Sequence, residues 1–187
     1  MEQRGGRRAG EGRRRRVAAR SRAVGATIGV ALVLVAVAST VTLGGPLEMA
    51  DGEYEVCAPL PRHAHAAYGV NLPSGRTADV TIASVAPVAP VGITVRSAHL
   101  ITYPDDHHRL MLDAYPPVEQ LPDLWPTAVG AIGATVPAGD VVDLVVELEA
   151  TGDEASLDGV EIVYTADGRT YVTQSHVAVT LRTAGCV

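Results

Sequence analysis

The clearest alternation of hydrophobic and polar positions lies in residues 141–149, which read VVDLVVELE. The apolar residues at positions 142, 144, 146 and 148 would face one side of a strand, and Asp143, Glu147 and Glu149 would face the other. A period of two is typical of a strand that is buried on one face and open to solvent on the other. We therefore expect a half-buried strand here.

A β-hairpin is predicted further along the chain. Residues 160–166 and 169–181 are rich in Val, Thr and Tyr, and they are separated by Asp167-Gly168. An Asp-Gly pair supplies the positive φ angles of a tight type I′ turn. The pattern predicts one strand on each side of this turn.

Other short apolar segments predict further strands. Residues 79–85 and 91–103 are separated by APVAP at 86–90, whose prolines cannot donate to a sheet ladder. Shorter candidates are residues 53–57, 108–112 and 128–136. Seven or eight short strands, without a sustained helical period, favour an antiparallel β-sandwich of immunoglobulin-like architecture spanning residues 44–187.

Residues 114–127, AYPPVEQLPDLWPT, hold four prolines and the chain's one tryptophan. This composition predicts a loop rather than a central strand. Trp125 could be an exposed contact for a partner, or it could pack over the edge of the sandwich and fill core volume that a chain without phenylalanine lacks. The packing interpretation is favoured.

A long uncharged segment precedes these strands. Residues 23–43, AVGATIGVALVLVAVASTVTL, would span roughly 30 Å as a helix, which matches the hydrocarbon core of a bilayer. Residues 1–22 carry nine arginines and two glutamates, a net charge of +7, whereas the first charges beyond the segment are Glu48 and Asp51. The positive-inside rule then predicts a single-pass plasma-membrane anchor, a disordered cytoplasmic arm at 1–22 and an extracytoplasmic domain at 44–187.

A cleaved signal peptide is the alternative interpretation of the same segment. A basic stretch, an apolar stretch and Ala36-Val37-Ala38 before Ser39 supply the parts of a cleavage site, and cleavage near Ala38 would release a secreted domain. The apolar segment continues past that point, which favours the anchor. Both interpretations place the bulk of the chain outside the cytoplasm.

The charge of the remaining chain limits its partners. Residues 23–187 hold six arginines and nineteen acidic residues, a net charge of −13, and the whole chain contains no lysine. Nucleic acid is therefore a disfavoured partner, and lysine Schiff-base chemistry is excluded. The arginine-for-lysine bias, with abundant Ala, Val and Gly, is typical of a high-GC bacterial composition.

Two cysteines lie on the exported side, Cys57 near the start of the domain and Cys186 near its end. In an oxidising compartment a disulfide is the default state of such a pair. We expect it to join the first strand of the domain to the last.

The histidines provide the one candidate metal site. His63 and His65 would share a face of a strand, and His107 and His108 follow two aspartates in a loop. Imidazole and carboxylate ligands suit Zn²⁺ or Cu²⁺ if these segments meet. The favoured interpretation is solvated histidines with no metal, and His99 and His176 are expected on sandwich faces.

Motifs of enzymes are missing from the sequence: it contains no G-x-S-x-G, S-x-x-K, H-E-x-x-H or G-x-G-x-x-G. We therefore expect a binding or structural module without catalytic residues or a cofactor. Its expected contacts are the bilayer, through residues 23–43, and a protein at the cell surface.

Overall fold

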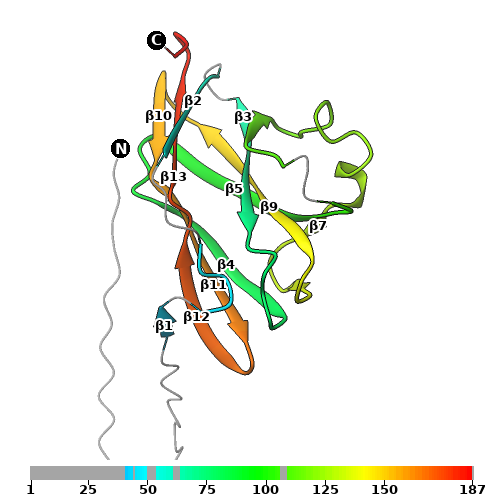
Figure 1. Ribbon diagram of the computed structural model, residues 1–187. Helices are drawn as coiled ribbons and strands as arrows, with labels where there is room; N and C mark the ends of the chain where they lie inside the picture. Colours follow the sequence, from blue (N-terminus) through cyan, green and yellow to red (C-terminus); the bar gives the residue numbers. More distant parts are fainter. Residues whose placement is uncertain (1–40, 44, 50–53, 61–63, 106–108, 187) are drawn as a thin grey trace, which may run out of the picture. The chain divides into compact units, whose positions relative to one another are not determined.

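The computed structural model describes residues 41–43, 45–49, 54–60, 64–105 and 109–186. These residues form an all-β fold with one 3-10 turn, η1 (Trp125–Thr127), and no α-helix among them (Figure 1). The strands are β1 (Val41–Leu43), β2 (Tyr54–Pro59), β3 (His65–Leu72), β4 (Val80–Val88), β5 (Ile93–Tyr103), β6 (Leu112–Ala114) and β7 (Val129–Gly130). They continue with β8 (Thr135–Val136), β9 (Val141–Ala150), β10 (Glu154–Leu157), β11 (Gly159–Ala166), β12 (Arg169–Gln174) and β13 (Val177–Arg182).

The strands form three sheets. Sheet A has the order β1-β12-β11-β4-β8, sheet B the order β10-β13-β2, and sheet C the order β6-β3-β9-β5-β7. Most pairs are antiparallel, as expected, but β1 pairs with β12 and β2 pairs with β13 in parallel. The expectation of a purely antiparallel fold was therefore wrong at these two edges, where segments from the start of the domain lie beside its last strands.

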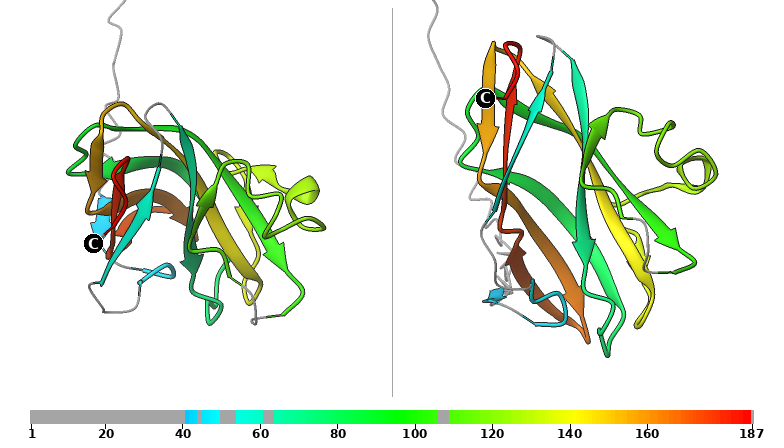
Figure 2. Two further views of the ribbon diagram at one scale, coloured as in Figure 1. Left: turned by 90° about the horizontal axis from the view of Figure 1, so that it is seen from above. Right: turned by 45° about the horizontal axis from the view of Figure 1, so that its top comes forward.

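The main core lies between sheets A and B on one side and sheet C on the other, which gives a β-sandwich-like arrangement (Figure 2). Ile82, Ile162 and Leu181 contribute from sheets A and B, and Tyr68 and Leu144 from sheet C. Packing apolar faces of sheets together in this way removes them from water and supplies most of the stability of such a fold.

The strand predicted at 141–149 is confirmed as β9, at the centre of sheet C. Its even-numbered apolar residues, 142 to 148, lie in the main core as predicted. Its second face was expected in solvent, and here the prediction was wrong: Asp143 is 0% exposed and Val145 is buried in a second cluster. The reason is that residues 109–128, hereafter the strap, include the edge strand β6 and pack other side chains, Leu110 and Leu121 among them, over this face of sheet C.

The predicted hairpin is confirmed at β11 and β12, with φ of 50° at Asp167 and 72° at Gly168. The second arm, however, is not one strand to Leu181. It breaks at Ser175-His176, so that β12 belongs to sheet A and β13 to sheet B. One continuous apolar segment thus crosses between two sheets.

Other expected segments differ from the structure at their ends. The connection predicted at 86–90 begins later, because β4 continues through Pro87 to Val88. Among the described residues this end of β4 pairs only with β11, and a proline is tolerated where a strand has a neighbour on one side. Residues 128–136 form two short strands, β7 and β8, and strand β6 covers residues 112–114 rather than 108–112. Strand β3 was not predicted as a separate strand.

The Cys57–Cys186 disulfide is confirmed, with the two Cα atoms 5.9 Å apart. Cys57 lies in β2, and Cys186 follows β13, which is the neighbour of β2 in sheet B. The bond therefore ties the start of the domain to its end, across 129 residues of sequence separation.

The described part of the N-terminal region belongs to the β fold. The last three residues of the expected membrane segment, Val41–Leu43, form β1 beside β12. Among the described residues no helix is long and apolar enough to cross a membrane. The arm at 1–22, residues 23–40 of the expected anchor and the Ala38 cleavage point all lie outside the described residues.

Residues 45–49 close one end of the core. Leu47 is 0% exposed, and its backbone N–H donates to the Tyr164 hydroxyl at 3.1 Å. Gly45 has a φ of +90°, and a Cβ there would lie 2.6 Å from the Tyr171 ring, so this close approach requires glycine. The ring of Tyr171 in turn stacks on that of Tyr164.

We predict that Leu47→Ala lowers the free energy of unfolding by about 2–5 kcal/mol, because it leaves a cavity in the core. Leu43→Ala, at a side chain 82% exposed, should change it by less than about 0.5 kcal/mol. Chemical unfolding of the full chain in a mild detergent, followed by near-UV circular dichroism, measures both. Equal stability of the two variants would contradict a structural role for residues 45–49.

Candidate functional site

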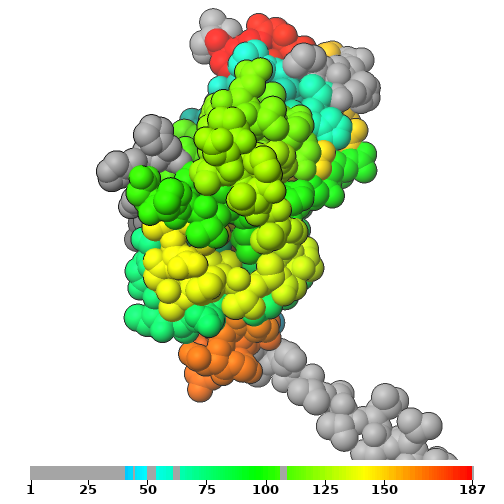
Figure 3. Space-filling view, turned by 90° about the vertical axis from the view of Figure 1, so that its right-hand side faces the viewer, coloured from blue at the N-terminus to red at the C-terminus, as the bar shows by residue number. Residues whose placement is uncertain are grey.

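Apolar side chains of the strap pack on the outer face of sheet C. Leu110 and Leu121 of the strap are buried against Ala67, Ile101 and Val145 of the sheet. Figure 3 shows this face, with the lime-green side chains of the strap lying over the sheet. The strap makes an otherwise solvent-facing surface into a second apolar layer.

An aromatic group lies at the edge of this layer. The Trp125 ring is half-buried and makes edge-on contacts with His99 at 5.3 Å and with Tyr115 at 5.4 Å between ring centroids. Edge-to-face rings at this separation attract one another beyond simple area burial. Trp125 thus has the packing position that the sequence favoured, and the partner-contact interpretation stays a prediction.

The strap is held to β9 by a buried ion pair. Arg109 Nη1 donates to Asp143 Oδ1 at 3.0 Å, and the Leu110 backbone N–H donates to Asp143 Oδ2 at 3.2 Å. Burial raises the pKa of the Asp143 carboxyl to about 6, although Arg109 and the Leu110 N–H act in the opposite direction. Burial, reinforced by the nearby Asp143 charge, also raises the pKa of Tyr103.

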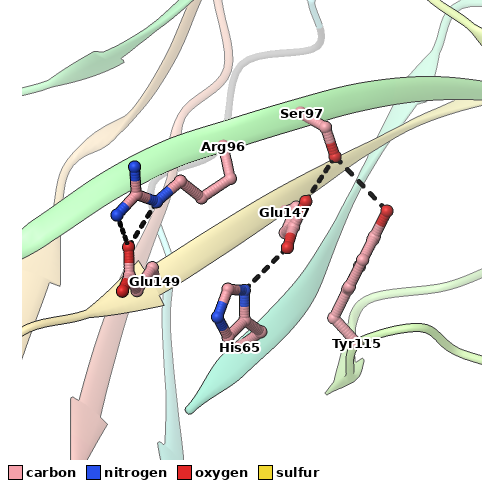
Figure 4. Close-up of polar contacts among 6 residues, drawn as sticks. All are labelled: His65, Arg96, Ser97, Tyr115, Glu147 and Glu149. Carbon is pink, nitrogen blue, oxygen red and sulfur yellow. Dashed lines mark hydrogen bonds and ion pairs between the residues drawn. The ribbon is translucent and has the colours of Figure 1, made fainter. Parts of the chain in front are cut away.

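A polar cluster lies on the same face of sheet C (Figure 4). The Glu147 carboxylate of β9 accepts a hydrogen bond from Ser97 Oγ at 2.5 Å and lies 2.6 Å from His65 Nδ1. The Ser97 and Tyr115 hydroxyls are 3.3 Å apart, which links the cluster to the strap. Strands β3, β9 and β5 and the strap therefore each supply one of its residues.

A second acid on β9 has its own partner. Arg96, the extra residue of a β-bulge between Val95 and Ser97 of β5, forms an ion pair with Glu149. The Arg96 side chain is 53% exposed and that of Glu149 only 16%. The outer acids of β9 thus have partners on the neighbouring strands or on the strap.

The order of groups in the cluster limits its chemistry. In a serine hydrolase the imidazole lies between the hydroxyl and the carboxylate, so that it can remove the hydroxyl proton. Here the carboxylate of Glu147 lies between Ser97 and His65, and the serine donates to the acid directly. The cluster therefore links side chains across three strands in an order that differs from a Ser-His-Asp triad.

The histidines of the alternative metal-site interpretation are not all in the described residues. His65 lies at the start of β3 and contacts Glu147, whereas His63, His107 and His108 lie outside the described part of the chain. Within that part, no three His, Cys, Asp or Glu side chains are grouped to hold a metal ion. His99 lies on the outer face of β5, while His176 is exposed between β12 and β13 rather than on a strand.

A cleft opens where the chain crosses from sheet A to sheet B. It has a volume of about 500 Å³ and is lined by Tyr54 and Glu55 of β2, by Gln174 and His176 at the crossover, and by Val88, Asp158 and Ala178. A smaller hollow of about 210 Å³ shares Tyr54 and His176 as walls. The volume of the larger cleft lies in the range of ligand pockets in proteins.

The crossover beside the cleft is fixed by a buried serine. Ser175 Oγ lies 3.1 Å from the Tyr68 hydroxyl and accepts a hydrogen bond from the Val160 N–H at 2.9 Å. The Tyr68 hydroxyl also donates to the Val177 carbonyl at 3.0 Å. Burial raises the pKa of Tyr68 to about 12, so this hydroxyl keeps its proton at neutral pH.

Neither the polar cluster nor the cleft was predicted from the sequence. Asp143 and Glu147 were taken as solvent-facing acids, and Tyr54, Asp158 and Gln174 had no distinguishing pattern. One available signal was that Asp143 lies between runs of β-branched and aliphatic residues, where a fully buried strand is also consistent with the composition.

We predict that Asp143 makes the fold more stable as the pH falls from 7 to 4. The folded carboxyl has a pKa of about 6, above its ordinary value of 3.8, so in this range the folded chain binds the proton more tightly than the unfolded chain does. The gain over this range is roughly 2 kcal/mol. It should be missing from Asp143→Asn.

Thermal unfolding of both proteins between pH 4 and 7 tests this expectation. As the pH falls toward 4, the stability of the wild type should rise relative to that of Asp143→Asn. Asp123→Asn, at an exposed acid of the strap, serves as the control and should follow the wild type. Parallel curves for wild type and Asp143→Asn would contradict the raised pKa.

No protein-family model matches the chain, and no curated protein sequence matches it. What these residues can do therefore follows from their own geometry and chemistry.

Proposed function

We propose that the chain is a membrane-anchored, exported binding module with an immunoglobulin-like β-sandwich as its extracytoplasmic part. The observation that carries this proposal is the Cys57–Cys186 disulfide. Disulfides persist in oxidising compartments and are rare in the cytosol. The basic residues before position 23 and the uncharged stretch after it supply the matching export signal.

A binding role is supported by what the fold presents. The cleft beside the sheet crossover combines aromatic, aliphatic and acidic side chains at one place. The polar cluster around Glu147, by contrast, has its groups in an order that suits cross-strand stabilisation rather than catalysis. We therefore infer a non-catalytic module that recognises a ligand or partner at the cell surface.

The export proposal predicts a specific outcome for the two thiols. In protein extracted from membranes of a bacterial host, the cysteines should resist alkylation until they are reduced, and then gain two alkyl groups. Cys186→Ser is the control, because it leaves Cys57 as a free thiol that alkylates without reduction. Alkylation of both wild-type thiols without reduction would contradict an oxidising location.

The intact mass of the same sample tests the anchor. A full-length chain in the membrane fraction is the expected result, and a protease added outside the cell should digest the β domain but spare residues 1–22. A mature chain beginning near Ser39 would instead show a secreted domain. Protection of the β domain from external protease would contradict export altogether.

A further inference from the structure

The cleft beside the sheet crossover has walls from both ends of the exported domain. Glu55 comes from β2, while Gln174 and His176 come from the crossover between β12 and β13. Strand β2 is held there by its parallel pairing with β13 and by the disulfide at Cys57. The cleft is therefore lined by segments that cross-strand and covalent bonds fix in place, as a preformed binding site requires.

Acidic side chains outnumber basic ones in the lining of the cleft. Glu55 and Asp158 are acidic, and none of the arginines of the described part of the chain lines the cleft. Thr180 Oγ1 donates to Glu55 Oε1 at 2.7 Å, which orients this carboxylate from the neighbouring strand. Glu55 and Asp158 are both exposed at the rim of the cleft, and two carboxylates beside one concave surface attract a cation.

The rest of the lining adds aromatic and aliphatic surface to these carboxylates. The Tyr54 side chain is 51% exposed, and Val88 and Ala178 add aliphatic surface beside it. A tyrosine ring attracts an ammonium group through its face, and aliphatic walls remove the methylene groups of a ligand from water. The Gln174 amide can accept or donate one further hydrogen bond.

We propose that this cleft binds an aliphatic ammonium ion, with the charged head between Glu55 and Asp158 and the alkyl chain against Tyr54, Val88 and Ala178. The proposal rests on the proposed binding function and names the ligand class for it. The same chemistry is presented by a free aliphatic amine and by a lysine side chain of another protein. The experiment below separates these two sources.

Calorimetric titration of the full chain, in a nonionic detergent at low salt and pH 7.5, tests the proposal. The first probe is 1,5-diaminopentane, and 1,5-pentanediol is its neutral counterpart of the same length. We expect saturable 1:1 binding of the diamine and no heat from the diol. A third probe, the blocked tripeptide acetyl-Gly-Lys-Gly-amide, distinguishes the sources: tighter binding than the diamine indicates a lysine side chain, and weaker binding indicates a free amine.

Matched variants locate the binding. Glu55→Gln and Asp158→Asn should each weaken diamine binding about tenfold, because each removes one charge-assisted contact. Glu119→Gln and Asp123→Asn remove the same charges from exposed positions of the strap and should leave the dissociation constant within about twofold. Unchanged melting temperatures confirm that the variants fold.

Two results would overturn the proposal. One is the lack of saturable heat with both the diamine and the tripeptide. The other is equal weakening in the cleft variants and the strap variants, which would mean diffuse attraction to an acidic surface. Neither result changes the alkylation and mass measurements, so failure of the ligand class and failure of the export proposal are distinguishable.

Discussion

The burial of β9 on both faces is the constraint on which the rest of the structure depends. One face of this central strand packs in the core between the sheets, and the other carries Asp143, Val145, Glu147 and Glu149. A strand with three acids on one face is stable in that position only if each acid has a partner. Arg109, the pair His65 and Ser97, and Arg96 supply those partners from three different segments. The acids of a single strand thus link the strap and both neighbouring strands through side-chain contacts.

The second organising feature is the crossover at Ser175-His176. The chain leaves sheet A and enters sheet B there without a loop, because Ser175 replaces lost ladder bonds with contacts to Tyr68 and the Val160 N–H. The divergence of the two sheets leaves space beside the crossover, and the walls of the cleft follow from it. The cleft is therefore a consequence of the topology rather than of a mobile loop.

Local signals in the sequence predicted the fold class and missed the sites for a common physical reason. The alternation in 141–149 and the Asp167-Gly168 turn act over a few residues, and both were confirmed. The disulfide followed from compartment chemistry and the presence of two cysteines. The burial of Asp143, the splitting of 169–181 between two sheets and the meeting of Tyr54 with Asp158 depend on segments far apart in sequence, so no local pattern carries them.

The net charge of residues 23–187 bears on how selective the cleft can be. With nineteen acids and six arginines after residue 22, long-range attraction concentrates every cation near the surface, and screening by salt weakens this attraction for all of them alike. Charge alone therefore cannot distinguish one cation from another. The apolar wall of the cleft can distinguish them, because only a ligand with an alkyl chain gains from burial against Tyr54, Val88 and Ala178. Selectivity at this site thus comes from its apolar wall, while the carboxylates set the sign of the charge that it accepts.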